Sequence, residues 1–314
     1  MLTRRHIRVK AMQSIYAMLQ SQNTDIDKED KFLSFSIANM YNLYLILISL
    51  LIEIREKAEE RLTLSKKKYL ATSEEINPNT SFVNNKVLLM LKDNSLIKEE
   101  LKRKKFNHWD IDSEYVTIIL DEIYSSKLYK NYMSKPVSSF SEDKGILMDI
   151  YREIIAPNEK LYDYIEDKNL TWLDDLPLVN TLILKVLKKA KTASDQSHFL
   201  PRLYKDEDDI KFARELFKKT VLNDEKLQNE IEGKTPNWDT ERIAEIDSIL
   251  LKMAICEFLN FPSIPVKVTI NEYLEIAKEY STPKSSIFIN GILDKLVKDY
   301  ENKKMLNKSG RGLM

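Results

Sequence analysis

The sequence predicts an all-α protein, because glycine is scarce, helix-forming residues are abundant and apolar residues recur at helical spacing. Only five glycines occur among 314 residues, whereas hairpins and phosphate-binding loops need glycine for positive φ or close backbone approach. Apolar residues make up 43% of the chain and charged residues 31%, enough to fill a core and cover a surface. The length suits one large domain or two ordinary ones.

The first predicted helix runs from about Thr3 to Gln22, with Thr3 as a candidate N-cap. Its apolar residues recur about one turn apart and so predict one stripe that faces a core. A polar break over residues 23–30 leads to a second helix over residues 31–64. Its apolar run, Leu43 to Ile52, is shorter than the roughly twenty apolar residues that span a bilayer. We therefore interpret it as a buried core helix, not a membrane segment.

Two further helices are predicted in the first half of the chain, over residues 82–105 and 113–133. The loop Asn77-Pro78-Asn79 precedes the first, and Pro136 ends the second, because a residue before proline avoids the helical conformation. The last part of the chain shows three more helical stretches and a basic tail: residues 241–259, 270–280, 285–302 and 303–314.

An internal repeat at an offset of 66 residues links the middle of the chain to its last third. Residues 158–172 (NEKLYDYIEDKNLTW) align without gaps on residues 224–238 (DEKLQNEIEGKTPNW), with seven of fifteen positions identical. Each copy ends at a tryptophan, Trp172 or Trp238, and a buried helix is expected after it. A duplicated helical hairpin explains the match, and convergent helix capping is the alternative.

Basic residues gather at the start of the first predicted helix: Arg4, Arg5, Arg8 and Lys10, with His6 among them. Guanidinium groups form forked hydrogen bonds to phosphate and stack on bases, so this edge is a candidate for RNA contact. A solvated basic face would explain the same residues. Cations near a helix N-terminus oppose the helix dipole, however, and that mild cost favours a functional reason.

Two other clusters allow more than one interpretation. The run over residues 98–105, followed by Phe106 and Trp109, could bind single-stranded nucleic acid, but acidic residues within it favour a solvated helix end. In the last helix, Asn290 and Gly291 interrupt an apolar pattern at a cost in stability relative to alanine. We expect Gly291 to permit close helix packing, with contact between Asn290 and a base as the alternative.

The sequence gives no support for catalysis, a cofactor or a metal site. Nucleotide-binding loops, nucleophile elbows and zinc-protease motifs are absent. Cys256 is the only cysteine, and the three histidines lack metal-ligand spacing, which excludes a disulfide framework and argues against metal binding. The formal net charge is zero, so RNA binding would depend on local clusters. Without an apolar signal region near the N-terminus, a cytoplasmic location is expected.

Two segments of the chain resemble the NusB family of transcription antitermination factors. The first has an arginine-rich start followed by alanine, glutamine and tyrosine at fixed spacing: RRHIRVKAMQSIY, residues 4–16. The second combines a proline turn, an INE helix start and an F-hydrophobic-NG helix in the order of the family, within residues 249–295. Lys252 and Cys256 depart from the family pattern, which commonly has arginine and an aromatic residue there.

The resemblance implies a NusB-like fold of packed helical bundles that binds the boxA RNA element of ribosomal RNA operons. It also implies a ribosomal protein partner, NusE, and a place in the RNA polymerase antitermination complex, with no catalytic and no membrane role. Carried over by position, the RNA-binding residues would be Arg4, Arg5, Arg8, Tyr16, Arg242, Lys267, Phe288 and Asn290. Asp247 falls where an acidic residue of the family faces the ribosomal protein.

The resemblance leaves the middle of the chain without an assigned role. We predict four regions: the first helix of the NusB fold over residues 1–22, an inserted helical region over 23–204, a C-terminal NusB-like bundle over 205–302 and a flexible basic tail over 303–314. The insertion is interpreted as partly a degenerate repeat of the NusB helices. It could widen the RNA surface, occlude it or bind something else.

Two other functions compete with RNA binding as explanations of this sequence. A helical protein–protein scaffold that kept the fold without binding RNA is favoured by the neutral charge and the long insertion. An RNA cytosine methyltransferase, to which NusB-like domains are also fused, would need a glycine-rich cofactor domain and catalytic cysteines. The sequence has neither, so this second alternative is rejected.

Overall fold

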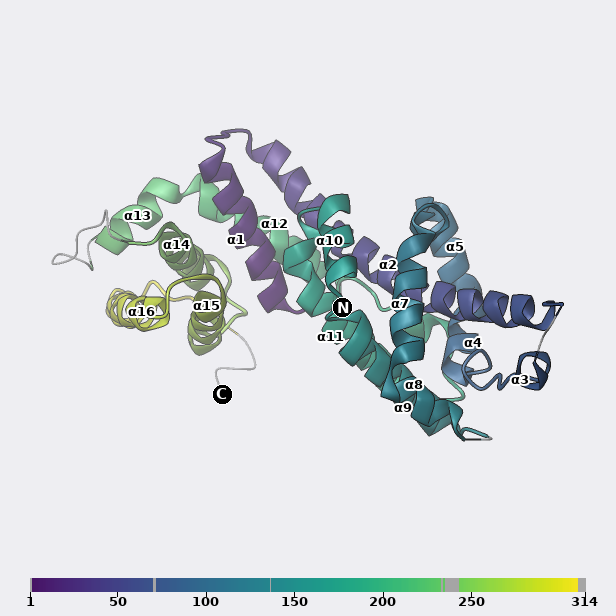
Figure 1. The fold of residues 1–314 in the computed structure, drawn as a ribbon. Coiled ribbons are helices and arrows are strands. Elements are labelled where there is room, and N and C mark those ends of the chain that lie inside the picture. The colour runs from purple at the N-terminus through teal and green to yellow at the C-terminus, as the bar shows by residue number, and fades with distance from the viewer. Residues whose placement is uncertain (1, 70–71, 136, 233, 235–242, 310–314) are drawn as a thin grey trace. The chain divides into compact units, whose positions relative to one another are not determined.

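The computed structural model describes residues 2–69, 72–135, 137–232, 234 and 243–309, and no strand occurs among them. The helices of this part of the chain confirm the predicted all-α class (Figure 1). They form two compact units. Unit 1 joins the two ends of the chain, Met1–Ile37 and Leu203–Met314, and unit 2 comprises Ala38–Arg202.

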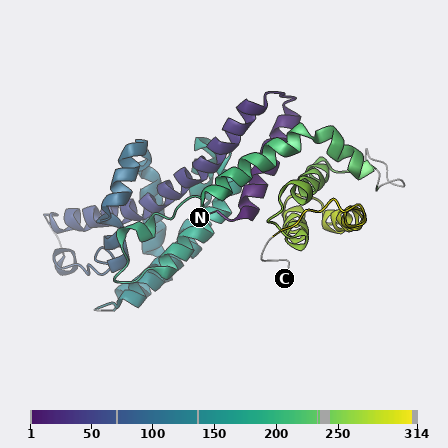
Figure 2. The ribbon, with the colours of Figure 1, turned by 180° about the vertical axis from the view of Figure 1, so that it is seen from behind.

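Unit 1 is a helical bundle built around α14. Its helices are α1 (Arg4–Gln20), the first turns of α2 (Ile26–Lys66), α12 (Glu207–Leu222), α13 (Asp224–Glu232), α14 (Glu245–Asn260), α15 (Val266–Tyr280) and α16 (Ser285–Asn302). α1, α12, α13, α15 and α16 all pack against α14 (Figure 1, Figure 2). Every residue of α14 from Ile249 to Phe258 is buried, which makes this helix the core of unit 1.

Unit 2 surrounds the apolar part of α2. Its other elements are α3 (Ser73–Ile76), α4 (Lys86–Lys92), α5 (Ser95–Lys104), α6 (His108–Ile111), α7 (Ser113–Ser125), α8 (Lys127–Met133), α9 (Phe140–Ile150), a π-helical continuation (Tyr151–Ile155), α10 (Glu159–Lys168), α11 (Trp172–Lys189) and a 3₁₀ turn (Gln196–Phe199). Trp109 and Trp172 donate hydrogen bonds from Nε1 to carbonyl oxygens of α2 at 3.1 and 3.0 Å. Tryptophan satisfies its N–H in this way when buried.

Helix α2 is long and apolar enough to cross a membrane, but 78% of its most apolar stretch is buried within the protein. Leu43, Leu47 and Leu50 are fully enclosed. A helix that protein surrounds on all sides can be as apolar as a membrane span, because all of its faces contact a protein core and not lipid. The burial agrees with the interpretation of this run as a core helix.

Two predicted helices are each divided in the structure. The stretch over residues 82–105 forms α4 and α5, because the Asn94 side chain accepts a hydrogen bond from the N–H of Ile97 at 3.0 Å. The stretch over residues 113–133 forms α7 and α8, separated at Ser126, whose hydroxyl accepts from Tyr129 N–H at 3.1 Å. Asparagine and serine compete with the helical backbone for these bonds, so they start a new helix where periodicity alone predicts continuation.

The two copies of the sequence repeat occupy corresponding helices. The first copy gives α10 between α9 and α11, and the second gives α13 between α12 and α14. Asn158 caps α10 by accepting from Leu161 N–H at 2.8 Å. Trp172 opens α11, whereas Trp238 lies outside the described residues. In each copy a short helix precedes a longer one, α11 or α14, and the duplication itself stays a prediction.

Two residues of the predicted flexible tail, Lys308 and Ser309, form hydrogen bonds with other parts of unit 1. Lys308 donates from Nζ to the carbonyl oxygens of Glu257 and Phe261 at 3.1 and 3.0 Å. Ser309 donates its N–H to the carbonyl of Pro262 at 3.0 Å. The described part of this predicted tail therefore contains residues that satisfy carbonyls at and just beyond the C-terminal end of α14.

Candidate functional site

A surface pocket of about 560 Å³ lies in unit 1 where α1 and α15 begin. It is lined by residues 3–6, Arg8, residues 263–265, Val268 and Glu272, and we call it the arginine pocket. Thr3 and Pro265 are the N-cap residues of the two helices. Helix N-termini carry unpaired N–H groups and a partial positive charge, both of which favour an anion.

Arg4 and Arg5 are accessible in this pocket, and each pairs with a carboxylate. Arg5 donates from Nε and Nη2 to the two oxygens of Glu272 on α15, both at 3.0 Å. Arg4 donates from Nε to Asp209 on α12 at 3.0 Å. The two arginine side chains are 38% and 40% exposed. The hydrogen bonds to Glu272 raise the pKa of Arg5 above its usual range, so the side chain stays cationic.

Arg8 lies below this surface and is only 1% exposed. It donates from Nε and Nη2 to the two oxygens of Glu257 on α14 at 2.8 and 2.6 Å. Thr269 and Tyr273 of α15 donate their hydroxyls to the same carboxylate at 2.7 and 3.3 Å. Burial by itself lowers the pKa of Arg8, but the bonds to Glu257 outweigh it and raise that pKa above its usual range.

This network ties α1 to α14 and α15, and in this conformation it leaves no exposed edge of the Arg8 guanidinium. A buried ion pair is stable only when its geometry is good and its remaining polar atoms are bonded, and both conditions hold for Arg8 and Glu257. The contact between Arg8 and RNA that the resemblance implies stays a prediction.

His6 completes the first turn of α1. Its Nδ1 accepts a hydrogen bond from Thr3 N–H at 3.1 Å, which closes a capping box with histidine in the place usually taken by glutamate or glutamine. Burial, and next the nearby Arg5, lower the pKa of His6 to about 4. The ring is therefore neutral near pH 7, and because Nδ1 is an acceptor its proton lies on Nε2.

Two other predicted site residues lie near the arginine pocket. Tyr16 is 39% exposed on α1, eleven residues after Arg5, which is about three helical turns and returns it to the same side. Lys267 is exposed in the first turn of α15, beside Val268 of the pocket. Arg242 lies outside the described residues.

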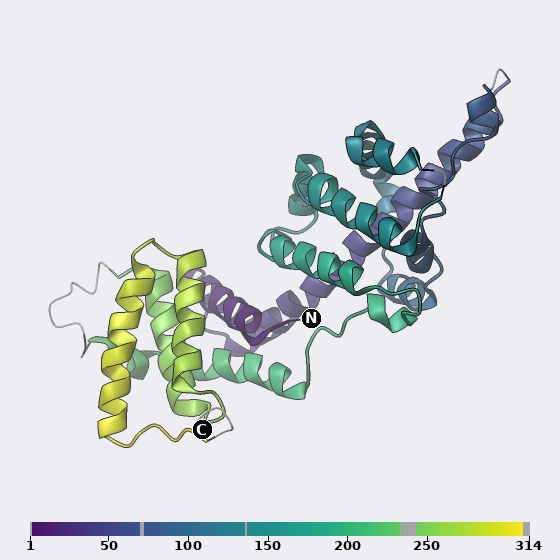
Figure 3. The same cartoon turned by 90° about the horizontal axis from the view of Figure 1, so that it is seen from below.

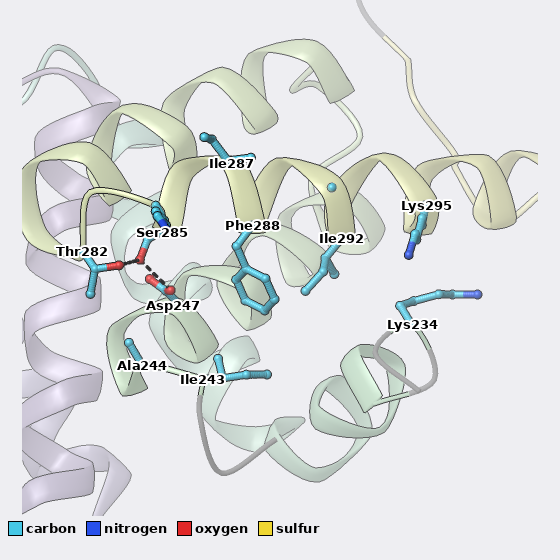
Figure 4. A pocket seen from close by; sticks show the side chains of 12 residues that line it. Lys234, Ile243, Ala244, Asp247, Thr282, Ser285, Ile287, Phe288, Ile292 and Lys295 are labelled. Atoms are coloured by element: carbon cyan, nitrogen blue, oxygen red, sulfur yellow. Dashed lines mark hydrogen bonds between the residues drawn. The ribbon is translucent and has the colours of Figure 1, made fainter. Parts of the chain in front are cut away.

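The second site feature is a pocket of about 530 Å³ beside α16, lined by Phe288, Gly291 and Ile292 on one side and by Ile243 and Ala244 on the other. We call it the Phe288 pocket. Figure 4 shows the Phe288 ring directed from α16 into this space, with the side chains of Lys234 and Lys295 at one end. The lining is mainly apolar, with cations at its edge, and this combination suits a flat aromatic ring linked to an anion.

Close helix packing, the expected reason for Gly291, is not seen: apart from the adjacent part of α16 itself, a Cβ built there would meet no heavy atom of the described residues within 4 Å. The packing interpretation is therefore wrong for the described helices. Gly291 borders the open Phe288 pocket instead. Asn290 is half-exposed on the same helix, and its Nδ2 donates to Asp294 at 3.3 Å.

Asp247, the predicted partner-binding residue, is buried at the base of the Phe288 pocket. Its two oxygens accept hydrogen bonds from the hydroxyls of Ser281, at 2.6 Å, and Ser285, at 2.7 Å. Figure 4 shows the bond from Ser285. Ser285 is the first residue of α16, so Asp247 fixes the start of the helix that carries Phe288. The carboxylate itself is not presented to solvent in this conformation.

The two departures from the family pattern fit the core of unit 1. Lys252 donates from Nζ to Asp224 at 2.7 Å, which links α14 to α13. Cys256 is fully buried, and burial raises the pKa of its thiol to about 11, so the thiol is unreactive near pH 7.

The sequence reasoning missed the carboxylates that pair with the arginines, Asp209, Glu257 and Glu272. One signal was available: Glu257 interrupts the apolar stretch MAICEFL of a predicted core helix. A charge at such a position needs a partner, and the arginines of the first helix were candidates. Nothing in the local sequence around Asp209 or Glu272 indicates which cation each would meet.

The family model and the relatives that match this chain are all of the NusB family. The NusB family model matches residues 178–298. The transcription antitermination protein NusB of Salinibacter ruber is 44% identical over 124 residues, which cover 39% of this chain and 78% of the relative. The NusB protein of Chloroherpeton thalassium is 44% identical over 109 residues, 34% of this chain and 52% of the relative. That of Clostridium kluyveri is 42% identical over 96 residues, 31% of this chain and 62% of the relative. No solved structure matches the chain significantly.

Proposed function

Because the chain belongs to the NusB family, we propose that it is a transcription antitermination factor that binds boxA-like RNA of ribosomal RNA operons through unit 1. We infer that it acts in the cytoplasm with the ribosomal protein NusE, within an RNA polymerase complex, and catalyses no reaction. The observation that carries this proposal is the arginine pocket, which lies at the N-termini of α1 and α15 and contains two accessible arginines of α1.

The chemistry of the pocket suits a phosphate group. Arg5 holds both oxygens of Glu272 in a fork, and a phosphate offers the same pair of acceptor oxygens with more negative charge. RNA binding would exchange the carboxylate partners of Arg4 and Arg5 for phosphates. The free N–H groups at the starts of α1 and α15 would add neutral donors to the same anion. Lys267 and Tyr16 would extend contact with the strand on either side.

In this account Arg8 acts as a positioning residue. Its bonds to Glu257 hold α1 against α14 and α15, and that contact keeps Arg4 and Arg5 beside the start of α15. Loss of Arg8 would therefore disturb RNA binding indirectly, through the orientation of the first turn of α1.

The Phe288 pocket supplies a place for a base. Phe288 could stack on an unpaired base, and such stacking contributes about 1–3 kcal/mol per base. Asn290 could donate to a base edge once released from Asp294, and the missing side chain of Gly291 would allow close approach of the strand. Arg242 is proposed as an RNA contact by its family position alone. Asp247 would serve the partner surface by fixing the start of α16 through Ser285.

The test is binding of the full chain to a boxA-like RNA and to a scrambled RNA of the same length, with and without NusE, over a range of salt. The proposal predicts preference for the boxA-like RNA, tighter binding with NusE, and a slope of log affinity against log salt of roughly −2 to −3 for three or four phosphate contacts. Equal affinity for the two RNAs would contradict it.

One observation favours the alternative of a protein–protein scaffold. All three arginines of the first turns are paired with carboxylates in the unbound chain, so the pocket carries little excess positive charge. A scaffold would bind neither RNA and would retain protein partners in a pull-down from cell extract after nuclease treatment.

A further inference from the structure

A third pocket, of about 490 Å³, lies in unit 2 at the C-terminal end of α11. It is lined by Lys144 of α9, residues 188–191, Ser194 and His198, and we call it the lysine pocket. α9 and α11 lie side by side in unit 2 (Figure 1, Figure 3). The lining contains four lysines and no carboxylate.

Two of the cationic or polar side chains are already engaged with the end of α11. Lys144 donates from Nζ to the carbonyl oxygens of Lys188 and Ala190 at 3.1 and 3.2 Å. His198 donates from Nε2 to the carbonyl of Val186 at 2.9 Å. Carbonyls at a helix C-terminus form the negative end of the helix dipole and would repel an anion. Lys144 and His198 satisfy them and so reduce that repulsion.

Three lysines of the pocket are left for a ligand. Lys188, Lys189 and Lys191 are exposed, and among the described residues none of them forms an ion pair. Ser194 Oγ accepts a hydrogen bond from Lys191 N–H at 2.9 Å, which leaves its hydroxyl proton free to donate outward. In a chain with equal numbers of acidic and basic residues, this group is a local excess of positive charge.

We propose that the lysine pocket binds backbone phosphates of the RNA that flanks the boxA-like element. The inference rests on the RNA-binding function proposed above. Lysine ammonium groups act as point charges for phosphate, and the pocket has no aromatic platform that would read or stack a base. Contact here would therefore add affinity without sequence preference, as phosphate contacts do. The absence of large apolar side chains from the lining argues against insertion into a lipid surface.

The test compares two variants of the full chain that lose the same charge. K188Q/K189Q/K191Q removes the three unpaired lysines. K57Q/K92Q/K135Q is the matched control, because these lysines lie in the same unit and pair with Glu60, Glu59 and Glu142. Each protein is titrated with a short boxA-like RNA and with the same RNA extended by unstructured flanks. Thermal unfolding of each variant confirms that it is folded.

The wild type is expected to bind the extended RNA more tightly than the short RNA. The pocket variant should bind the extended RNA about tenfold more weakly near 0.1 M salt. Its slope of log affinity against log salt should also become shallower by about 2, because each of the three lost phosphate contacts contributes about 0.7 for a single strand. Its affinity for the short RNA should not change, and the control should keep wild-type behaviour with both RNAs.

Equal losses in the two variants, or no loss in either, would overturn the inference. A pocket variant that binds the extended RNA normally but no longer binds phosphatidylserine vesicles would also overturn it and assign the pocket to a membrane surface. Failure of the wild type to bind the short RNA would instead contradict the function proposed for unit 1, whatever the extended RNA shows.

Discussion

The arginine pocket of unit 1 and the lysine pocket of unit 2 hold their cations in opposite ways. Arg4 and Arg5 are paired with carboxylates and so held in fixed orientations, whereas Lys188, Lys189 and Lys191 are exposed and have no ion-pair partner among the described residues. An ion pair with a carboxylate lowers the net positive charge of the pocket, but it holds the guanidinium group in one orientation. Unpaired lysines keep their charge and adapt to any arrangement of phosphates. We expect selectivity from the first pocket and general affinity from the second.

The largest expected effect is a loss of stability in unit 1 when the buried ion pair between Arg8 and Glu257 is broken. Arg8→Ala would leave the carboxylate of Glu257 unpaired in the core of unit 1, and breaking a buried pair in this way costs about 3–5 kcal/mol. Urea unfolding near pH 7 measures the loss. The double variant R8M/E257L, which removes both charges, should lose much less. Equal losses in the single and double variants would show that packing, not the ion pair, gives Arg8 its importance.

The next effect concerns His6, whose pKa of about 4 lies below the ordinary value of 6.5. The unfolded chain takes up a proton between about pH 6.5 and 4 that the folded chain does not, so stability is present above this window and falls as pH decreases through it. We expect a loss of about 1–2 kcal/mol from this residue after allowance for solvent.

The control is H6Q, which keeps an acceptor for Thr3 N–H but cannot titrate. Unfolding of both proteins from pH 7 to 4 isolates the contribution of His6 to the pH dependence of stability, because the other titrating groups, His108 included, contribute equally in the two proteins. Identical pH profiles for the wild type and H6Q would refute the prediction.

A smaller effect comes from the Phe288 pocket, where Gly291→Ala should stabilise unit 1. Alanine is favoured over glycine inside a helix by about 0.5–1 kcal/mol, and the added methyl group meets no described atom within 4 Å apart from the adjacent part of α16 itself. Denaturant unfolding measures the gain. If the pocket receives RNA, the same variant should bind boxA-like RNA more weakly while being more stable. A destabilised G291A would show that the helix packs closely at this point after all.

The smallest effect returns to the lysine pocket. Lysines in the last turn of a helix interact favourably with its dipole, so K188Q/K189Q should lower stability by only about 0.3–1 kcal/mol. Urea unfolding of this variant and of R8A compares how much the cations of each pocket contribute to stability. A loss as large as that of R8A would mean that these lysines are structural and would weaken the case for a ligand.

Much of this architecture is predictable from the sequence, because helices depend on local periodicity. The all-α class and the position of the last helix follow from apolar spacing, and the arginine-rich start is visible directly. Apolar spacing alone does not predict the divisions at Asn94 and Ser126, although both residues are strong N-caps. Capping preference, taken together with periodicity, indicates both positions.

The pairing within the site is harder to predict, because it joins residues far apart in the chain. Arg8 meets Glu257 across 249 positions, and only the packed bundle decides which arginine is buried. The lysine pocket left a clearer signal: no acidic residue occurs from Lys185 to Ser194, whereas Glu99 and Glu100 interrupt the basic run over residues 98–105. An unbroken basic stretch indicates unpaired charge better than the number of lysines does.

The central claim, that the arginine pocket binds boxA-like RNA, is tested most directly by comparing R4A/R5A with R103A/R152A. The control removes two arginines that also pair with carboxylates, Glu100 and Asp149, but lie in unit 2. In titrations of the short boxA-like RNA over a range of salt, R4A/R5A should lose at least about tenfold in affinity, and its salt slope should become shallower by about 1.4. The control should match the wild type. Unchanged affinity and slope in R4A/R5A, or the same loss in both variants, would contradict the account.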